Sequence, residues 1–349
     1  MLLRYHRSMP TFGLAFFMCL TTSIGVSACY QESASVNVEG IVGTATWHAT
    51  LSHPPQNVTA DQVQTGLDNV LTAANHTIAS WEPSSELSRF NQYQGTDWFN
   101  VSPDLAQLVQ LTLQVSEQSG GVYDVTVGPL IKLWGFSADG IAQDRVPSPA
   151  EIAAARAKVG YHKLQVRLDP PALRKSQADI RVELASVADG FAADQAGHYL
   201  ESLGVQQYMV EVAGEVRTRG NSPRGDAWRI GVEKPLDLGR AVQQGIQLQN
   251  AGLATSGDYR NFFTEKGKRY SHTLDPATGY PVQHNLASVS VLANEAALAD
   301  AYATTLMAMG EVKGKAFADQ LGLTAYFIWR TDKGFDVYPT AKFMPVLIP

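Results

Sequence analysis

Helical and β-strand patterns follow one another along this chain without the regular strand–helix–strand repeat that builds a parallel sheet. A β-rich segment at residues 44–51 precedes a helical pattern of apolar residues from Val63 to Ile78. Late in the chain, a helical pattern over residues 298–309 ends at Gly310 and is followed by a β-rich segment at residues 323–329. The mixture favours an α+β fold over a doubly wound parallel sheet.

Capping and turn signals predict further elements between these ends. Ser102-Pro103-Asp104 is typical of a helix start, and Ser148 with Glu151 has the spacing of a capping box. The expected helices cover residues 102–115, 148–159 and 191–203, the last ended by Gly204, and the expected strands cover residues 205–212 and 228–232.

Composition limits the class of protein. The chain has 349 residues, of which 45% are hydrophobic and 17% charged, so it can bury a large core. Length alone suggests two domains, but no low-complexity linker divides the chain, which favours one unit of two lobes. A net charge of −6 with scattered cations makes nucleic acid an unexpected partner.

The N-terminus has the pattern of a secretory signal peptide. Arg4 and Arg7 precede an apolar stretch over residues 12–26, and Cys19 and Cys29 are the only cysteines. Ser27-Ala28-Cys29 resembles a bacterial lipobox, although an ordinary signal-peptidase site and an uncleaved anchor helix remain alternatives. We expect a lipoprotein signal peptide at residues 1–28, lipid on Cys29, a tether at 29–43 and one globular domain at 44–349.

Two polar segments in the first half of the domain interrupt the apolar patterns. SELSRFN at residues 85–91 reads as a helix start capped by Ser85. GGVYDVTVGPLIKLWGF at residues 120–136 is either a glycine-rich turn between core segments or a place where backbone approaches a flat heterocycle, with Tyr123 and Asp124 beside it.

A third segment, ELASVADG at residues 183–190, puts small residues between acidic ones just before a helix. Backbone amides at a helix N-terminus bind phosphate readily, and carboxylates at such a site require a cation. Asp189 has a simpler alternative, because an aspartate there is also typical of a helix cap.

The fourth segment covers residues 254–281 and is followed by ADAYAT at residues 299–304. Asp300 and Thr304 are four residues apart, so a helix would present both oxygens on one face to an ion such as magnesium, unless that face is simply solvated. His272 lies in a loop rich in Gly, Pro and Ser, where it suits either general-base chemistry or a structural hydrogen bond.

In their order along the chain, these segments resemble the signature blocks of the ApbE family. The blocks are SELSRFN, YDVTVGPLIKLWGF, ELASVADGFAAD, VAGEVRTRG, ATSGDYRNFF, SHTLDPATGYP and ADAYATTLMAMG, within residues 44–310. The resemblance implies an α+β fold of two related, T-fold-like lobes with mostly antiparallel sheets, and FAD bound between the lobes as a substrate.

The resemblance also implies roles for individual residues. His272 would be the catalytic base, and Mg²⁺ would be held by Ser186 through its backbone oxygen and by Asp300 and Thr304. The flavin nucleotide would contact Trp81, Val122, Tyr123, Asp124, Glu183, Asp189 and Leu274. Three places depart from the usual family pattern: Ala213-Gly214, Asp189 and Val42-Gly43-Thr44.

The implied reaction is transfer of FMN from FAD to a threonine of another protein, with AMP leaving. The expected acceptors are flavin-bearing subunits of membrane electron-transfer complexes, and the expected place is the periplasm, with the enzyme lipid-anchored to a bacterial membrane. A magnesium-dependent FAD pyrophosphatase shares every one of these residues and stays open, as does an FAD-binding lipoprotein without catalysis.

Overall fold

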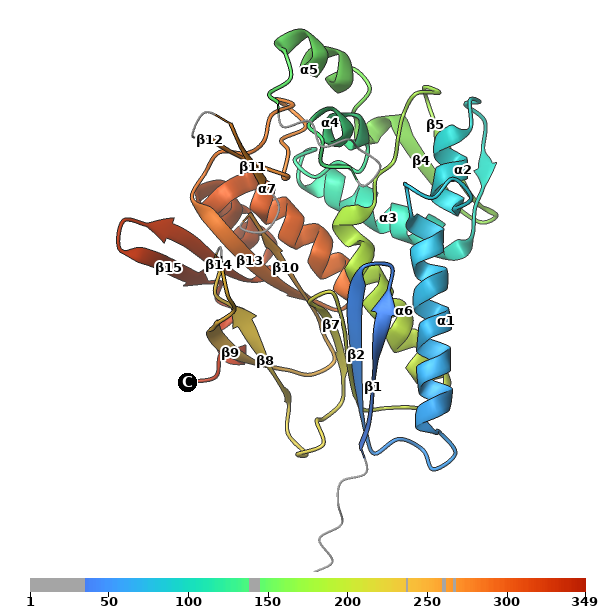
Figure 1. Cartoon of the computed structure of the whole chain (residues 1–349), viewed down its shortest axis with the longest axis vertical. Coiled ribbons are helices and arrows are strands. Elements are labelled where there is room, and N and C mark those ends of the chain that lie inside the picture. The colour runs from blue at the N-terminus through green and yellow to red at the C-terminus, as the bar shows by residue number, and fades with distance from the viewer. Residues whose placement is uncertain (1–34, 138–144, 237, 259–261, 266–267) are drawn as a thin grey trace, which may run out of the picture. The chain divides into compact units, whose positions relative to one another are not determined.

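An antiparallel sheet of eight strands organises the part of the chain that the computed structural model describes, namely residues 35–137, 145–236, 238–258, 262–265 and 268–349 (Figure 1). All neighbouring strands in it are antiparallel, which confirms the predicted α+β class. The strands lie in the order β1 (Ser35–Val42), β2 (Ala45–Ser52), β6 (Tyr208–Val212), β7 (Glu215–Arg219), β10 (Gly252–Gly257), β13 (Leu286–Ala293), β14 (Thr324–Thr331) and β15 (Gly334–Pro339).

Side-chain alternation explains why these segments form strands. In β2, Trp47, Ala49 and Leu51 point into the core while the residues between them are less buried, as a period of two requires. In β13 the six residues from Leu286 to Val291 are all buried, because both faces of this central strand are covered.

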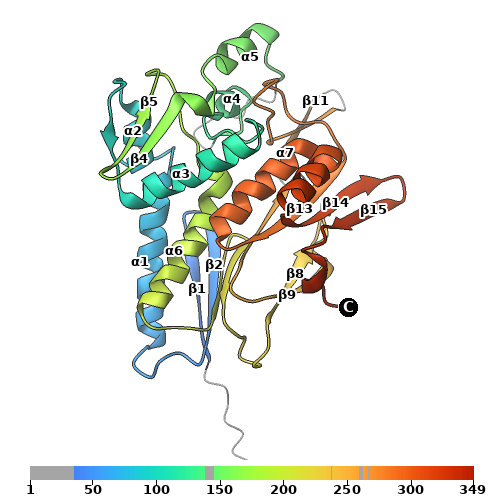
Figure 2. The same cartoon turned by 180° about the vertical axis from the view of Figure 1, so that it is seen from behind.

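Three long helices cover one face of the sheet, as the view from behind shows (Figure 2). They are α1 (Ala60–Ile78), α6 (Ala188–Ser202) and α7 (Ala296–Leu321). The apolar stripe predicted for α1 is buried against β1 and α6, and Thr59 caps the helix by accepting a hydrogen bond from the Gln62 N–H.

The opposite face of the sheet is partly covered by the hairpin of β8 (Trp228–Glu233) and β9 (Val242–Leu248). Apolar residues of this hairpin, the sheet and the C-terminal segment form one cluster that includes Ile246, Ile328 and Phe343. Residues 33–349 thus form a single compact unit around this eight-stranded sheet.

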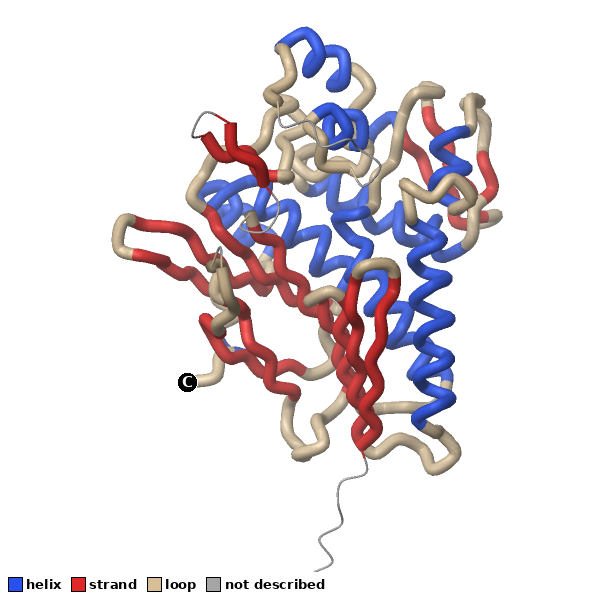
Figure 3. Tube along the Cα trace, viewed as in Figure 1, coloured by secondary structure: helices blue, strands red, loops and turns tan. Residues whose placement is uncertain are grey.

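Residues between α1 and α6 form a smaller layer beside the helices (Figure 3). Its sheet has the order β3–β5–β4. The elements are α2 (Glu86–Gln92), β3 (Phe99–Asn100), α3 (Pro103–Gln118), α4 (Gly128–Leu133), α5 (Pro149–Arg156), η1 (Tyr161–Lys163), β4 (Leu164–Leu168), β5 (Pro171–Lys175) and η2 (Ala185–Val187), while β11 (Phe262–Glu265), β12 (Lys268–Ser271) and η3 (Met344–Val346) lie later in the chain.

Several predicted boundaries were wrong. Residues 35–42, expected in the tether, form β1, because pairing with β2 satisfies their backbone and Val38 joins the core. The helix expected to end at Gly310 is only interrupted there and continues to Leu321. The predicted strand at 205–212 begins only at Tyr208, and α5 ends at Arg156 rather than at residue 159.

The other predicted helices and strands are present. Ser85 caps α2, and Ser148 and Glu151 make the expected capping box. The departures at Ala213-Gly214 and Gly43 lie in hairpin turns, where Ala213 adopts a φ of 53° and Gly43 a φ of 60°. Signal peptide 1–28 and Cys29 lie outside the described residues. None of the described helices has the length and apolar composition of a membrane span.

Candidate active site

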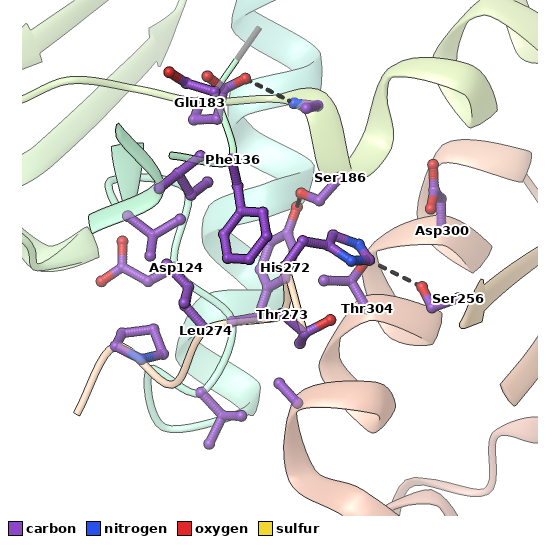
Figure 4. Close-up of a pocket in the computed structure, with 18 of the residues that line it drawn as sticks. Asp124, Phe136, Glu183, Ser186, Ser256, His272, Thr273, Leu274, Asp300 and Thr304 are labelled. Atoms are coloured by element: carbon purple, nitrogen blue, oxygen red, sulfur yellow. Dashed lines mark hydrogen bonds between the residues drawn. The ribbon is translucent and has the colours of Figure 1, made fainter. Parts of the chain in front are cut away.

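A cavity of about 550 Å³ lies where the smaller layer meets α7, the end of β10 and the loop beyond β12 (Figure 4). Segments far apart in the sequence contribute to it, which explains why its outline could not be seen in any single motif. Ten of the eleven site residues predicted within the domain line it: Trp81, Val122, Tyr123, Asp124, Glu183, Ser186, His272, Leu274, Asp300 and Thr304.

One wall of the cavity is apolar and aromatic. Trp81 is 46% exposed at the wall, although the indole is a large apolar group. Ile131 of α4 and Phe136 just after that helix line the cavity, and Leu274 adds an aliphatic side chain from the loop after β12. An exposed indole beside apolar side chains suits a flat heterocycle with a polar edge.

The loop at residues 122–127 is held rigidly by its own carboxylate. One Asp124 oxygen accepts hydrogen bonds from the Thr126 N–H at 2.8 Å and the Thr126 hydroxyl at 2.6 Å. The other accepts from the Tyr161 N–H at 2.8 Å. Burial nevertheless raises the pKa of Asp124. Asp124 therefore both lines the cavity and holds this loop in place.

Tyr123 and Glu183 tie the neighbouring segments to this wall. The Tyr123 hydroxyl lies 3.0 Å from the Ser186 hydroxyl, and burial raises the pKa of Tyr123, so the phenol stays protonated. Glu183 accepts hydrogen bonds from the Ser80 hydroxyl at 2.7 Å and the Ala185 N–H at 3.1 Å. Glu183 thus fixes the position of the segment that carries Trp81.

The polar end of the cavity is formed by α7 and the end of β10. Asp300 and Thr304 stand one turn apart on α7, as the sequence predicted, and Thr304 lies 3.3 Å from the Ser256 hydroxyl. The Asp300 side chain is buried and accepts a long hydrogen bond of 3.4 Å from the Gly190 N–H. Burial, reinforced by the charge of Asp189, raises the pKa of Asp300 well above its usual range.

Asp189 takes a different place from the predicted one. It is neither a cavity-lining residue nor the cap of α6, because Val187 occupies the cap position and Asp189 lies in the first turn. Burial raises its pKa to about 6. Asp189 instead acts electrostatically on Asp300 and on Glu215 of β7, a buried carboxylate that the sequence did not single out.

The carboxylates of Asp189, Glu215 and Asp300 lie close enough to repel one another. Ionising all three is costly unless a cation lies nearby. Burial raises the pKa of Glu215 well above its usual range, and Asp300 and Asp189 add to the effect. Within the described ranges, no three His, Cys, Asp or Glu side chains converge tightly enough to form a metal site by themselves. The donor set at this end fits a hard cation that also takes hydroxyl, backbone and substrate oxygens.

His272 follows β12 and reaches the cavity from the loop that also carries Thr273 and Leu274. Its ring lies edge-on to Phe136, with centroids 6.4 Å apart, and points toward Ser256 beside Thr304 (Figure 4). This position puts a titratable nitrogen between the aromatic wall and the polar end, where a proton acceptor would meet a reacting oxygen.

Sequence reasoning missed other cavity residues, although signals for some were present. Ser256 stands inside the quoted ATSGDYR block, and Phe136 closes the glycine-rich block. Ser80, Val127, Ile131, Thr255, Gly257, Thr273, Pro276 and Ala308 also line the cavity.

The antiparallel fold and a cavity with an aromatic wall and a buried acidic end suit a protein that binds a flat heterocycle together with a cation. Comparison with known proteins narrows this class. The ApbE family profile matches residues 43–327. The chain belongs to the ApbE family.

Two relatives with the same printed name match almost the whole length of this chain. The chain is 36% identical to the FAD:protein FMN transferase of Haemophilus influenzae, covering 93% of this chain and 95% of the relative. The enzyme of the same name from Vibrio cholerae is also 36% identical, covering 95% of this chain and 98% of the relative.

Solved structures show the same fold. The flavin transferase ApbE from Vibrio cholerae matches with a TM-score of 0.82 at 36% identity, covering 90% of this chain and 100% of that one. The apo flavinyl transferase ApbE of Pseudomonas stutzeri matches with a TM-score of 0.82 at 33% identity, covering 90% and 97%.

Proposed function

We propose that this protein is an FAD:protein FMN transferase, which moves FMN from FAD to a threonine of an acceptor protein. The observation that carries the proposal is the cavity in which an aromatic wall meets Asp300, Thr304 and His272. The names of relatives that match more than nine-tenths of the chain support the same activity.

In the proposed reaction, the threonine hydroxyl oxygen attacks the phosphorus on the FMN side of the FAD pyrophosphate. A bond forms between that oxygen and phosphorus, the bond to the bridging oxygen breaks, and AMP leaves with the bridging oxygen. His272 takes the hydroxyl proton, since an unactivated hydroxyl is a poor nucleophile. Trp81 and Leu274 hold the flavin ring, which is cargo and undergoes no redox change.

Magnesium is part of the proposal, and Asp300 with Thr304 and the backbone oxygen of Ser186 are its protein ligands. The buried and mutually repelling carboxylates at this end fit a divalent cation, as described above. A magnesium ion bound there would neutralise negative charge on the pyrophosphate. The side chains of Asp189 and Glu215 add negative potential around the ligands without lining the cavity.

Hydrolysis of FAD is the competing activity, since water would need the same residues as threonine does. Incubation with FAD, magnesium and candidate acceptor domains, followed by denaturing gel fluorescence, separates the two. Transfer predicts a fluorescent acceptor band, whereas hydrolysis predicts free FMN and AMP with no labelled protein. A flavin-binding protein without catalysis would leave FAD intact.

We also propose that the mature protein is lipid-anchored at Cys29 on the periplasmic side of a bacterial membrane. There it would meet flavin-bearing subunits of membrane electron-transfer complexes. Support comes from the leader pattern at residues 12–28 and the position of Cys29. Intact-mass measurement of the membrane-extracted protein should show a chain beginning at lipid-modified Cys29, and a retained leader or an unmodified Cys29 would contradict it.

A further inference from the structure

The α2 helix takes no part in the proposed reaction, although it carries the SELSRFN block that the sequence singles out. Its buried side chains fall into two groups. Leu87 and Phe90 pack in the apolar core, as an amphipathic helix requires. Ser85, Ser88 and Asn91 are buried as well, with exposures of 0%, 4% and 8%. Because residues three apart are neighbours on one side of a helix, these three form a buried polar stripe.

The first two members of the polar stripe bind the main chain just before Trp81. The Ser85 hydroxyl donates to the Ala79 carbonyl at 2.6 Å. The Ser88 hydroxyl lies within hydrogen-bond distance of two carbonyls, that of Ala79 at 3.0 Å and that of Ser80 at 3.1 Å. The indole of Trp81 is 46% exposed, so packing alone does not fix its position. The two hydroxyls instead hold the backbone that carries it.

The third member binds another segment of the cavity wall. Asn91 makes two hydrogen bonds with Val182, since Nδ2 donates to the Val182 carbonyl and Oδ1 accepts from the Val182 N–H, both at 2.8 Å. Val182 directly precedes Glu183, whose carboxylate accepts from the Ser80 hydroxyl at 2.7 Å. The contacts therefore close a ring that runs from α2 through Ser80, Glu183 and Val182 back to α2.

The polar stripe is best explained by what it holds. A buried polar side chain needs a hydrogen-bond partner, whereas an apolar one could pack at the same place without any. Apart from one N–H of α2 itself, the partners of the stripe are main-chain groups of two segments. Both segments continue into the cavity lining, one with Ser80 and Trp81 and the other with Glu183 and Ser186.

From these contacts we infer that Ser88 is a positioning residue for flavin binding, which acts by holding the Trp81 segment against the segment that carries Glu183. The inference rests on the proposed FMN transfer, because it takes the flavin of FAD as the group that Trp81 contacts. Ser88 does not line the cavity, so it acts through the indole and does not touch the flavin. An indole that is already held in place loses less freedom when the flavin binds, which raises the affinity for FAD.

A double-mutant cycle on FAD affinity tests the inference. The Kd for FAD is measured by titration calorimetry on the full chain, in EDTA and without an acceptor, so that FAD is not consumed. Ser88→Ala, Trp81→Ala and the double variant are compared with the wild-type protein. The control is Ser116→Ala, because Ser116 of α3 is also buried, its hydroxyl donates to the Thr112 carbonyl at 2.9 Å, and it does not line the cavity.

We expect Ser88→Ala to raise the Kd for FAD about fivefold when Trp81 is present, which is in the usual range for one lost hydrogen bond. In the Trp81→Ala background the same change should raise the Kd less than about twofold, because the group that Ser88 positions is gone. Ser116→Ala should leave the Kd unchanged, whatever it does to the melting temperature.

Equal effects of Ser88→Ala in the two backgrounds would overturn the inference, because the hydroxyl would then influence FAD independently of Trp81. An unchanged Kd in Ser88→Ala with Trp81 present would overturn it too, since the indole would be held without that hydroxyl. A wild-type protein that does not bind FAD would instead overturn the proposed function itself.

Discussion

At the level of single residues, the proposed chemistry depends most on His272. The ring stands between the aromatic wall and the polar end of the cavity, and no role in the core is needed to explain it. We expect His272→Ala to slow FMN transfer by about 100-fold or more, the usual loss for an acid–base group. Equilibrium binding of FAD should stay close to that of the wild-type protein.

Two measurements separate this role from a structural one. If His272 were structural, its replacement would lower FAD affinity and melting temperature together. If it is the base, its replacement lowers only the rate of transfer. Transfer at a near wild-type rate by His272→Ala, with FAD and magnesium saturating, would show that another group takes the proton. His198→Ala on the exposed face of α6 is the matched control.

Asp300 and Thr304 should differ in how much they contribute to magnesium binding. A hard cation loses more from a missing carboxylate than from a missing hydroxyl. Magnesium should raise the melting temperature of the FAD complex of the wild-type protein, because a ligand that binds only the folded state stabilises it. The increment should vanish in Asp300→Asn and shrink in Thr304→Val. A full increment in Asp300→Asn contradicts the assignment, and the exposed Asp332→Asn is the control.

Lys175 gives a pH-dependent prediction far from the cavity. Its side chain is 1% exposed, and Nζ donates to the Phe90 and Asn91 carbonyls at 3.3 and 3.2 Å. Burial lowers the pKa of Lys175 from 10.5 to about 8. Between these values the unfolded chain holds more protons than the folded one, so this residue favours folding increasingly as pH rises.

The comparison needed is between the wild-type protein and Lys175→Met in denaturant unfolding. The wild-type free energy of unfolding, relative to the variant, should rise from pH 7 to pH 10 because only the wild-type protein carries the shifted lysine. A difference that stays constant over this range would mean that the amine keeps its ordinary pKa in the folded protein.

At the level of elements, the break in α7 is the feature with the largest predicted effect on stability. The backbone angles of Gly310 lie in a region that is almost closed to other residues, and an added Cβ would meet the His284 ring at 2.7 Å. Gly310→Ala should therefore lower the free energy of unfolding by about 2–4 kcal/mol.

Gly43→Ala is the control for this prediction, since Gly43 also has a positive φ but an added Cβ would meet nothing within 4 Å. It should cost about 1 kcal/mol, from the backbone alone. Equal losses in the two variants would show that the close approach of His284 contributes nothing.

The same helix shows what the sequence could predict about elements. Apolar periodicity located α1, α3 and the first part of α7, because the helices bury one face and their caps are local signals. The sequence predicted that the helix ends at Gly310. Glycine with a positive φ occurs both where a helix ends and where it is interrupted, so the pattern could not distinguish the two. β1 was missed because the strand lies at the sheet edge, where much of its surface stays exposed and its pattern is weak.

At the level of the whole molecule, the candidate site was predictable where local motifs carry it and not where packing creates it. Ten predicted residues meet in one cavity, although their motifs are spread from Trp81 to Thr304. The electrostatic coupling of Asp189 with Glu215 depends on how α6 packs against β7, which no local pattern encodes. The approach of His284 to α7 likewise depends on contact between a loop and a helix break.

FMN transfer is the central claim, and stoichiometry tests it most directly. The measurement follows, in one reaction with FAD, magnesium and an acceptor domain, the AMP released and the acceptor molecules that gain FMN, by chromatography and intact mass. Peptide mapping should locate the added FMN on a threonine. The account predicts one FMN attached for each AMP released. AMP released with no mass change on the acceptor would contradict it and identify an FAD hydrolase instead.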